Sequence, residues 1–221
     1  MHTWNLTETA ALELQEQLAN KIVLATLEKP VDYVAGVDVA YAKSTDTVVA
    51  AAVVFDAVNL EVIDKSTAIQ KTNFPYIPGL FSFRELPSVL EALSLLTTQP
   101  QLIVCDGHGI AHPRRFGLAN HLGLLTNIPS IGCAKTPLLT ATSEVETARG
   151  QIAILQLNGE IVGNVLRTQT GVKPVYVSPG HKITLPESID WILKLSPKFR
   201  LPKTTRQADQ LVKKALSEIN K

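Results

Sequence analysis

The sequence predicts an α/β fold in which helices cover both faces of one mixed sheet. Two early segments are rich in valine and alanine and a third alternates in polarity, and the short links between the three indicate an antiparallel meander. Short apolar segments then alternate with helical ones, as in sheets that contain parallel strands. The composition agrees, because a chain that is 45% hydrophobic and 19% charged is not a disordered one. Its 221 residues suit a single domain over residues 1–221.

The first part of the chain is predicted to form one helix followed by the meander. Asn5 and Glu8 have the spacing of a capping box, and leucines and alanines recur at helical intervals as far as Glu28. A helix of about twenty residues should therefore end before Pro30. The three strands are expected at residues 33–41, 48–55 and 61–69, with links at 42–47 and 56–60.

The rest of the chain is predicted to alternate helices and strands. A loop rich in proline and glycine, residues 73–80, precedes a helix at 82–96. The Asn158-Gly159 pair is the strongest turn signal and predicts a hairpin of residues 151–157 and 160–167. The other strands are expected at 101–105, 130–133 and 173–177, and the other helices at 115–126, 187–195 and 206–219. This order of elements is expected of an RNase H-like fold, and many other α/β folds have it as well.

Charge, cysteine usage and targeting signals narrow the classes of function. The net charge of +1 excludes a protein that binds polyanions through a large overall positive charge. It does not exclude one that binds them through a local basic patch. Residues 194–221 hold eight basic and two acidic residues and are a candidate duplex-binding face. Cys105 and Cys133 lie in apolar runs and should be buried, reduced thiols. The sequence contains neither a signal peptide nor a membrane-spanning segment, so we expect a cytoplasmic protein without a membrane partner.

Asp38 is the first candidate functional residue. It lies inside a predicted strand, where a charge is costly unless it is paired or binds a metal. Alternation places it on one face with Gly36 and Ala40, and these small neighbours would let another backbone approach closely. The alternatives are an aspartate that faces solvent on an edge strand and one that pairs with a buried arginine.

Two further carboxylates have both a functional and a structural interpretation. Asp106 ends an apolar strand and precedes Gly107, which is where open α/β sheets place ligand sites, although an Asp-Gly turn is also common. Glu85 follows the loop at 73–80, but with Ser82 it also has the spacing of a capping box. Carboxylates that arrive from separate elements suit Mg²⁺, and two such ions can drive hydrolysis of a phosphodiester.

Other chemistries fit the sequence less well. His108 and His112 are four residues apart, as in a zinc pair on a helix, but the neighbouring glycines and Pro113 disfavour a helix there. Neither cysteine has the exposed, electropositive surroundings of a nucleophile. Tyr76, bracketed by prolines, is either a wedge or stacking group or a corner residue packed on the core.

Taken together, several short segments resemble the endonuclease V family, the deoxyinosine 3′-endonucleases. They occur in the family's order, span most of the chain and include Asp38, Glu85, Asp106 and Asp209. The matching segments are residues 35–41, 75–80, 82–85, 106–119, 131–135, 176–181 and 201–209.

This resemblance implies an RNase H-like nuclease that depends on Mg²⁺, with Mn²⁺ as a substitute, and that recognises hypoxanthine. It implies cleavage of the second phosphodiester bond 3′ to the lesion, leaving 3′-hydroxyl and 5′-phosphate ends. Asp38 and Asp106 match the family's metal-binding aspartates, and Glu85 its third acidic residue. Lys135 matches a lysine near the scissile phosphate. Asp209 matches a fourth active-site group that is either Asp or His in the family.

The resemblance also implies a set of substrate contacts. Tyr76 matches the aromatic residue of a wedge loop that enters the strand-separated site beside the damaged base. Arg114 could hold a phosphate at the start of a helix or be ordinary surface charge. The other residues expected to contact the substrate are Pro78, Gly79, Gly107, Gly109 and His112.

The expected partner is DNA that contains deoxyinosine, bound by a monomer. Three other readings stay open at this point. They are an endoribonuclease specific for inosine in RNA, a non-catalytic lesion-binding module on the same fold, and another RNase H-like nuclease such as a junction resolvase. The loop around Tyr76 and the segment at 106–119 favour the endonuclease V interpretation over the last of these.

Overall fold

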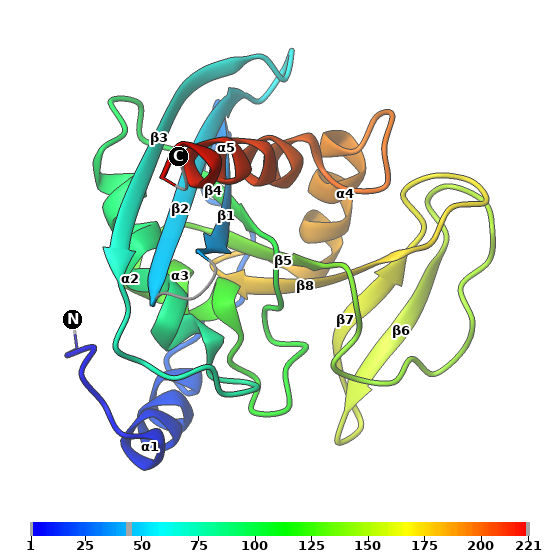
Figure 1. Cartoon of the computed structure of the whole chain (residues 1–221). Helices are drawn as coiled ribbons and strands as arrows, with labels where there is room; N and C mark the ends of the chain where they lie inside the picture. Colours follow the sequence, from blue (N-terminus) through cyan, green and yellow to red (C-terminus); the bar gives the residue numbers. More distant parts are fainter. Residues whose placement is uncertain (1, 43–45, 220–221) are drawn as a thin grey trace.

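One mixed sheet organises the molecule. The computed structural model describes residues 2–42 and 46–219, and in this part of the chain eight strands form a sheet of order β3-β2-β1-β4-β5-β8-β7-β6 (Figure 1). The strands are β1 (Tyr33–Tyr41), β2 (Thr47–Asp56), β3 (Val62–Lys71), β4 (Leu102–Cys105), β5 (Ser130–Ala134), β6 (Ile152–Leu157), β7 (Glu160–Leu166) and β8 (Val175–His181).

The predicted mixed sheet is confirmed. Strands β1, β2 and β3 pair antiparallel, as a meander does, and β1, β4 and β5 pair parallel. Strands β8, β7 and β6 extend the sheet with antiparallel pairs, of which β6 and β7 form the hairpin predicted at Asn158-Gly159. Both turn residues have positive φ, 53° and 84°, as expected for this dipeptide in a tight hairpin.

Helices cover both faces of the sheet, as predicted. The helices are α1 (Glu8–Ala19), α2 (Phe81–Ser94), α3 (Leu118–Thr126), α4 (Leu185–Leu195) and α5 (Lys203–Ile219). Helices α2 and α3 pack on one face, and α4 and α5 pack on the other, where α5 crosses β1 and β2 (Figure 1). Helix α1 lies apart from the sheet and packs Ala11 against Phe74, Leu80 and Phe83.

Alternation along β1 divides its side chains between the two faces. Ala35 and Val37 join the core under α2, whereas Val34 joins the core under α5. Gly36 lies against α5 so closely that an added Cβ would overlap the backbone of Thr204. The expected close approach of a backbone on the Gly36 face is therefore confirmed, and the backbone belongs to α5.

The first predicted helix is too long. Helix α1 spans only Glu8–Ala19, and Thr7 is its N-cap, accepting a hydrogen bond from the Ala10 amide at 3.3 Å. The following segment, 20–28, is not helical because its backbone groups bond to other elements. Lys182 donates its amide to the Val23 carbonyl at 2.7 Å, and Leu27 donates to the Glu187 carboxylate at 3.0 Å. The predicted capping box at Asn5 and Glu8 is wrong, because the N-cap of α1 is Thr7 and not Asn5.

Other boundaries differ by a few residues. Helix α3 begins at Leu118 rather than at 115, since Arg115 has a φ of 54° and Gly117 is the N-cap. Strand β8 continues to His181, beyond the predicted end at 177, because it pairs with the whole of β5. Both cysteines are buried and unpaired, as predicted. The predicted link at 42–47 lies partly outside the described residues. No helix within the described ranges is long and apolar enough to cross a membrane.

We expect Gly36→Ala to destabilise the protein by about 3 kcal/mol, because the atoms that would clash belong to the α5 backbone and cannot rotate away. Gly171→Ala is the matched control, since a Cβ there meets nothing within 4 Å and costs only the strain of a φ of 73°. The measurement is urea unfolding followed by circular dichroism. Equal losses of stability in the two variants would contradict the close packing of α5 on β1.

Candidate active site

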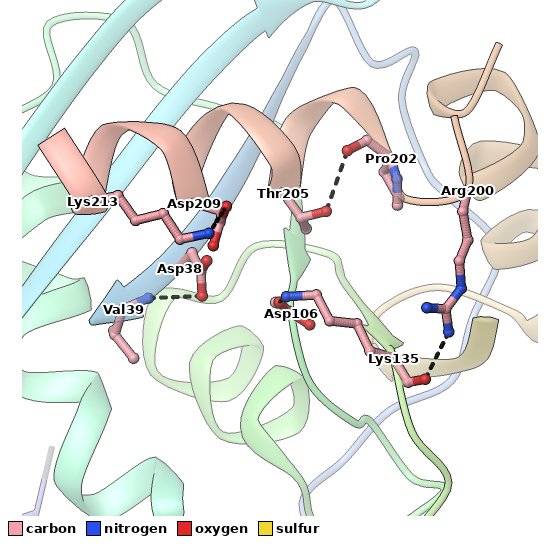
Figure 2. Close-up of polar contacts among 9 residues, drawn as sticks. All are labelled: Asp38, Val39, Asp106, Lys135, Arg200, Pro202, Thr205, Asp209 and Lys213. Atoms are coloured by element: carbon pink, nitrogen blue, oxygen red, sulfur yellow. Dashed lines mark hydrogen bonds and ion pairs between the residues drawn. The ribbon is translucent and has the colours of Figure 1, made fainter. Parts of the chain in front are cut away.

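Asp38 and Asp106 lie side by side where two parallel strands meet. Val37 of β1 and Cys105 of β4 are register partners and both face α2, so the next residue of each chain segment turns toward α5. Figure 2 shows the two aspartates beneath α5. Burial and then the negative charge of Asp106 raise the pKa of Asp38 to about 7, although its carboxylate accepts a hydrogen bond from the Val39 amide at 2.9 Å.

Glu85 reaches the same site from α2. The helix begins at Phe81 without a side-chain cap, and the Ser82 hydroxyl instead lies 3.0 Å from Nδ1 of His121. The capping-box interpretation of Glu85 is therefore wrong. Tyr41 donates its hydroxyl hydrogen to Glu85 at 2.7 Å. The pKa of Glu85 is raised to about 7, because burial and the charge of Asp106 outweigh the lowering by the Tyr41 hydrogen bond and by the charge of Arg84.

Lys135 places a positive charge against Asp106. It follows the last residue of β5, and its ammonium forms an ion pair with the Asp106 carboxylate (Figure 2). Burial lowers the pKa of Lys135, but the hydrogen bond and charge of Asp106 raise it by more. The Arg200 guanidinium donates to the Lys135 carbonyl at 2.7 Å and to the Pro174 carbonyl at 2.8 Å. This clamp fixes the backbone from which the lysine extends.

Asp209 is the fourth acidic group, and α5 carries it toward Asp38. Its carboxylate accepts a hydrogen bond from Lys213, one turn further along the helix, at 2.6 Å (Figure 2). The negative charge of Asp209 contributes to the raised pKa of Asp38, which places the two groups within electrostatic reach. The close approach of α5 at Gly36 is what brings Asp209 to this position.

The residues fit a hard divalent cation in their chemistry. All four acids offer carboxylate oxygens, the donors that Mg²⁺ prefers, and it commonly binds through one or two carboxylates and several waters. In the described part of the chain, however, no three potential ligands lie close enough to form a complete protein cage. Lysines instead neutralise Asp106 and Asp209. A metal held by Asp38 and Asp106 thus remains a prediction that the donor set supports.

A pocket of about 470 Å³ opens beside these carboxylates. It is lined by predicted catalytic and substrate-binding residues from three separate parts of the chain and by apolar side chains between them. The predicted site residues that it contains are Glu85, Asp106, Lys135, Pro78, Gly79, Gly107 and His112. The remaining ones, which do not line this pocket, are Asp38, Asp209, Tyr76, Gly109 and Arg114.

The two histidines near the pocket are neutral in the folded protein. Burial lowers the pKa of both His108 and His112 to about 4, and Arg114 adds to the effect on His112. The segment that carries them is not helical, so it does not present the two rings as a zinc pair on a helix would. The Nδ1 atom of His108 is buried and makes no hydrogen bond.

Tyr76 lies at the tip of a braced loop. Its side chain is 65% exposed, and its ring lies 4.5 Å from that of Phe81. Two side chains hold the loop behind it, since Arg114 and Gln15 donate to the Gly79 carbonyl at 3.0 and 2.9 Å. The exposed-wedge interpretation of Tyr76 fits this geometry better than the corner packed on the core.

Arg114 and Gly109 both form hydrogen bonds within the protein. The Arg114 guanidinium bonds to Gln15 and Gly79, so it braces the loop and is not free surface charge. Gly109 donates its amide to the Ser178 hydroxyl at 2.8 Å, and an added Cβ would overlap Pro179. Sequence reasoning did not single out Gln15, Tyr41 or Arg200 as site residues, although Tyr41 lies within the matching segment at 35–41.

Comparison with known proteins places the chain among endonucleases. The family model described as Endonuclease V matches residues 16–210. Endonuclease V of Trichormus variabilis is 50% identical over 211 residues, which cover 95% of this chain and 96% of that protein. The crystal structure of Endonuclease V from Streptomyces avermitilis superposes with a TM-score of 0.94 at 48% identity, covering 99% of this chain and 96% of that one.

A more distant structure was solved with nucleic acid. It is a variant of Endonuclease V from Ciona intestinalis in complex with a DNA 23-mer that contains an inosine followed by a ribo-adenosine. It matches with a TM-score of 0.85 at 28% identity, and the match covers 97% of this chain and 100% of that one.

We expect the free energy of unfolding of metal-free protein to fall as the pH rises from about 4 to about 7. The folded state keeps a proton on Asp38, whose pKa is about 7, whereas the unfolded chain releases it near 3.8. Asp38→Asn should remove the Asp38 share of this loss, leaving the share of Glu85, and should be more stable than wild type by about 4 kcal/mol at pH 8, with little difference at pH 4. Urea unfolding in EDTA across this range measures it, with exposed Asp32→Asn as the control. If the difference in stability between Asp38→Asn and wild type does not change with pH, the raised pKa of Asp38 is contradicted.

Proposed function

This chain belongs to the endonuclease V family and is a nuclease acting on phosphodiester bonds, and we propose that it acts at deoxyinosine in DNA. It hydrolyses the second phosphodiester bond 3′ to the lesion and leaves 3′-hydroxyl and 5′-phosphate ends. The observation that carries the proposal is the ion pair of Asp106 and Lys135 on the wall of a pocket of about 470 Å³, with Asp38 next to Asp106. A phosphate-cleaving centre beside a pocket is what a nuclease needs to read one base and cut a nearby bond.

The acidic groups have separate roles in the proposed reaction. Asp38 and Asp106 hold Mg²⁺, or Mn²⁺ in its place, which when bound activates a water molecule and offsets charge on the phosphate. Glu85 is held by Tyr41 and orients the attacking water by hydrogen bonding. Asp209 contributes a second acceptor from the α5 side. Lys135 neutralises charge on the transferred phosphate as its contact with Asp106 is exchanged for the substrate.

The pocket takes the hypoxanthine base after the base has left the stack. Extrusion costs a few kcal/mol and least for a weakly paired base, which favours a lesion over a normal pair. Gly107 brings the backbone to the pocket wall without a side chain, and neutral His112 borders the same space. Tyr76, presented by a loop that Arg114 and Gln15 brace, fills the gap between the separated strands.

RNA is a second candidate substrate, for a specific reason. In the Ciona intestinalis complex, a ribonucleotide directly follows the inosine. A 2′-hydroxyl next to the lesion is what would let a site distinguish RNA from DNA. Parallel cleavage of matched inosine-containing DNA and RNA strands separates the two candidates by their relative kcat/KM.

We expect wild-type protein to nick a duplex with one deoxyinosine at the second bond on its 3′ side, only when Mg²⁺ or Mn²⁺ is present. Asp38→Ala should lower kcat by at least about 10³-fold while affinity for the duplex changes little, because metal-dependent charge stabilisation acts in the reaction step. Asp32→Ala removes an exposed carboxylate at the start of β1 and should cleave like wild type. Denaturing gels locate the nick. Cleavage by Asp38→Ala at the wild-type rate would rule out the metal role.

We expect Tyr76→Ala to weaken binding of the inosine duplex about tenfold, because stacking of a base on an aromatic ring contributes on the order of 1–3 kcal/mol. Tyr76→Phe keeps the ring and should bind like wild type. Affinity for an undamaged duplex should not change in either variant. Fluorescence anisotropy with labelled duplexes gives these affinities. The wedge role fails if Tyr76→Ala binds the lesion as tightly as Tyr76→Phe.

A further inference from the structure

A basic and aromatic patch lies at the N-terminal end of α5, outside the site described above. We define the flank patch as Lys198, Phe199, Lys203 and Arg206. It surrounds a hollow of about 320 Å³ whose floor includes Leu60, Leu195 and Leu201. We propose that the flank patch binds the sugar–phosphate backbone of the substrate DNA on one side of the cleaved bond; this inference rests on the proposed function.

The pair of Phe199 and Arg206 is the centre of the patch. Phe199 is 54% exposed, and the Arg206 guanidinium carbon lies 3.7 Å from the centre of its ring. Stacking fixes the plane of the guanidinium while its N–H groups stay free to point outward, the arrangement with which arginine binds phosphate. The ring edge offers an apolar surface to a deoxyribose.

Most of the positive charge in the patch has no acidic partner. Within the described residues, no carboxylate lies within 4.0 Å of the side-chain nitrogens of Lys198, Lys203 or Arg206. Lys203 donates to the Leu60 carbonyl at 2.7 Å, which holds it beside the hollow without neutralising its charge. Unpaired cations gathered around an apolar floor attract a polyanion that also carries apolar groups, and nucleic acid is such a ligand.

The patch is continuous with the catalytic site along α5. Arg206, Asp209 and Lys213 are spaced three and four residues apart, so they form one row on the helix surface. Asp209 in the middle of the row points toward Asp38 (Figure 2). From Asp209 back to Arg206 the helix rises about 4.5 Å, close to the axial spacing of neighbouring phosphates on one strand. A strand with one phosphate at the carboxylates therefore has its next phosphates near Arg206.

Binding of inosine duplexes by Arg206→Ala tests the inference. We expect affinity to fall about tenfold and the slope of log K against log salt to become shallower by about one, as the loss of one phosphate contact requires. Phe199→Ala should weaken binding several-fold through lost contact with the sugar. The matched control is Lys29→Ala, which removes an exposed charge. Lys29 lies near Pro129, the residue before β5, at the end of the strand opposite the carboxylates. It should change neither quantity. Arg206→Gln replaces Arg206→Ala if the latter lowers the Tm.

Trimmed duplexes locate the contact. Shortening the duplex from one side of the lesion should remove the difference between wild type and Arg206→Ala, and shortening it from the other side should not. An affinity and salt slope in Arg206→Ala equal to those of Lys29→Ala would overturn the inference. So would a loss of affinity that survives trimming from both sides. Nicking of the same duplexes by the wild type is measured in parallel, and absent cleavage would show that the proposed function fails. Binding of an undamaged duplex, measured by anisotropy, still tests the flank patch in that case.

Discussion

The burial of Asp38 beside a second carboxylate, Asp106, is the constraint on which the site depends. Parallel pairing of β1 with β4 forces Asp38 and Asp106 to leave the sheet side by side on one face. Burial and this proximity raise the pKa of Asp38 to about 7, which destabilises the folded protein wherever the group is ionised. Lys135 offsets part of the cost, and a divalent cation would offset more. Perturbed groups of this kind are typical of functional sites, since a structural core has no reason to keep them.

Two features of the fold hold the rest of the site around these aspartates. The missing side chain at Gly36 lets α5 lie directly on β1, and this contact carries Asp209 to the carboxylates. On the other side, Arg114 and Gln15 both bond to the Gly79 carbonyl and so stiffen the loop that presents Tyr76. Rigid support of this kind limits the conformational entropy that substrate binding would otherwise cost.

The proposed function and the flank patch together describe a substrate footprint. In this proposal, the pocket beside Glu85 and Asp106 takes one extruded base, and the row from Arg206 to Lys213 binds the backbone next to it. Base recognition supplies specificity, whereas contacts to phosphate and sugar supply sequence-independent affinity and fix the register of the cut. The near-neutral net charge of +1 is compatible with this arrangement because the positive charge is local to the α5 side.

The sequence by itself determined the mixed sheet, the hairpin at Asn158-Gly159 and the acidic residues of the candidate site, because these follow from alternation, turn chemistry and short matching segments. It misplaced the end of the first helix, since hydrogen bonds that join Val23 and Leu27 to distant elements outweigh a local helical pattern. From the sequence, Glu85 had two interpretations, a helix cap and an active-site acid. Only the tertiary structure excluded the helix cap and showed how Gln15 supports the loop, because burial and long-range hydrogen bonds depend on which elements pack together and leave no local signal in the chain.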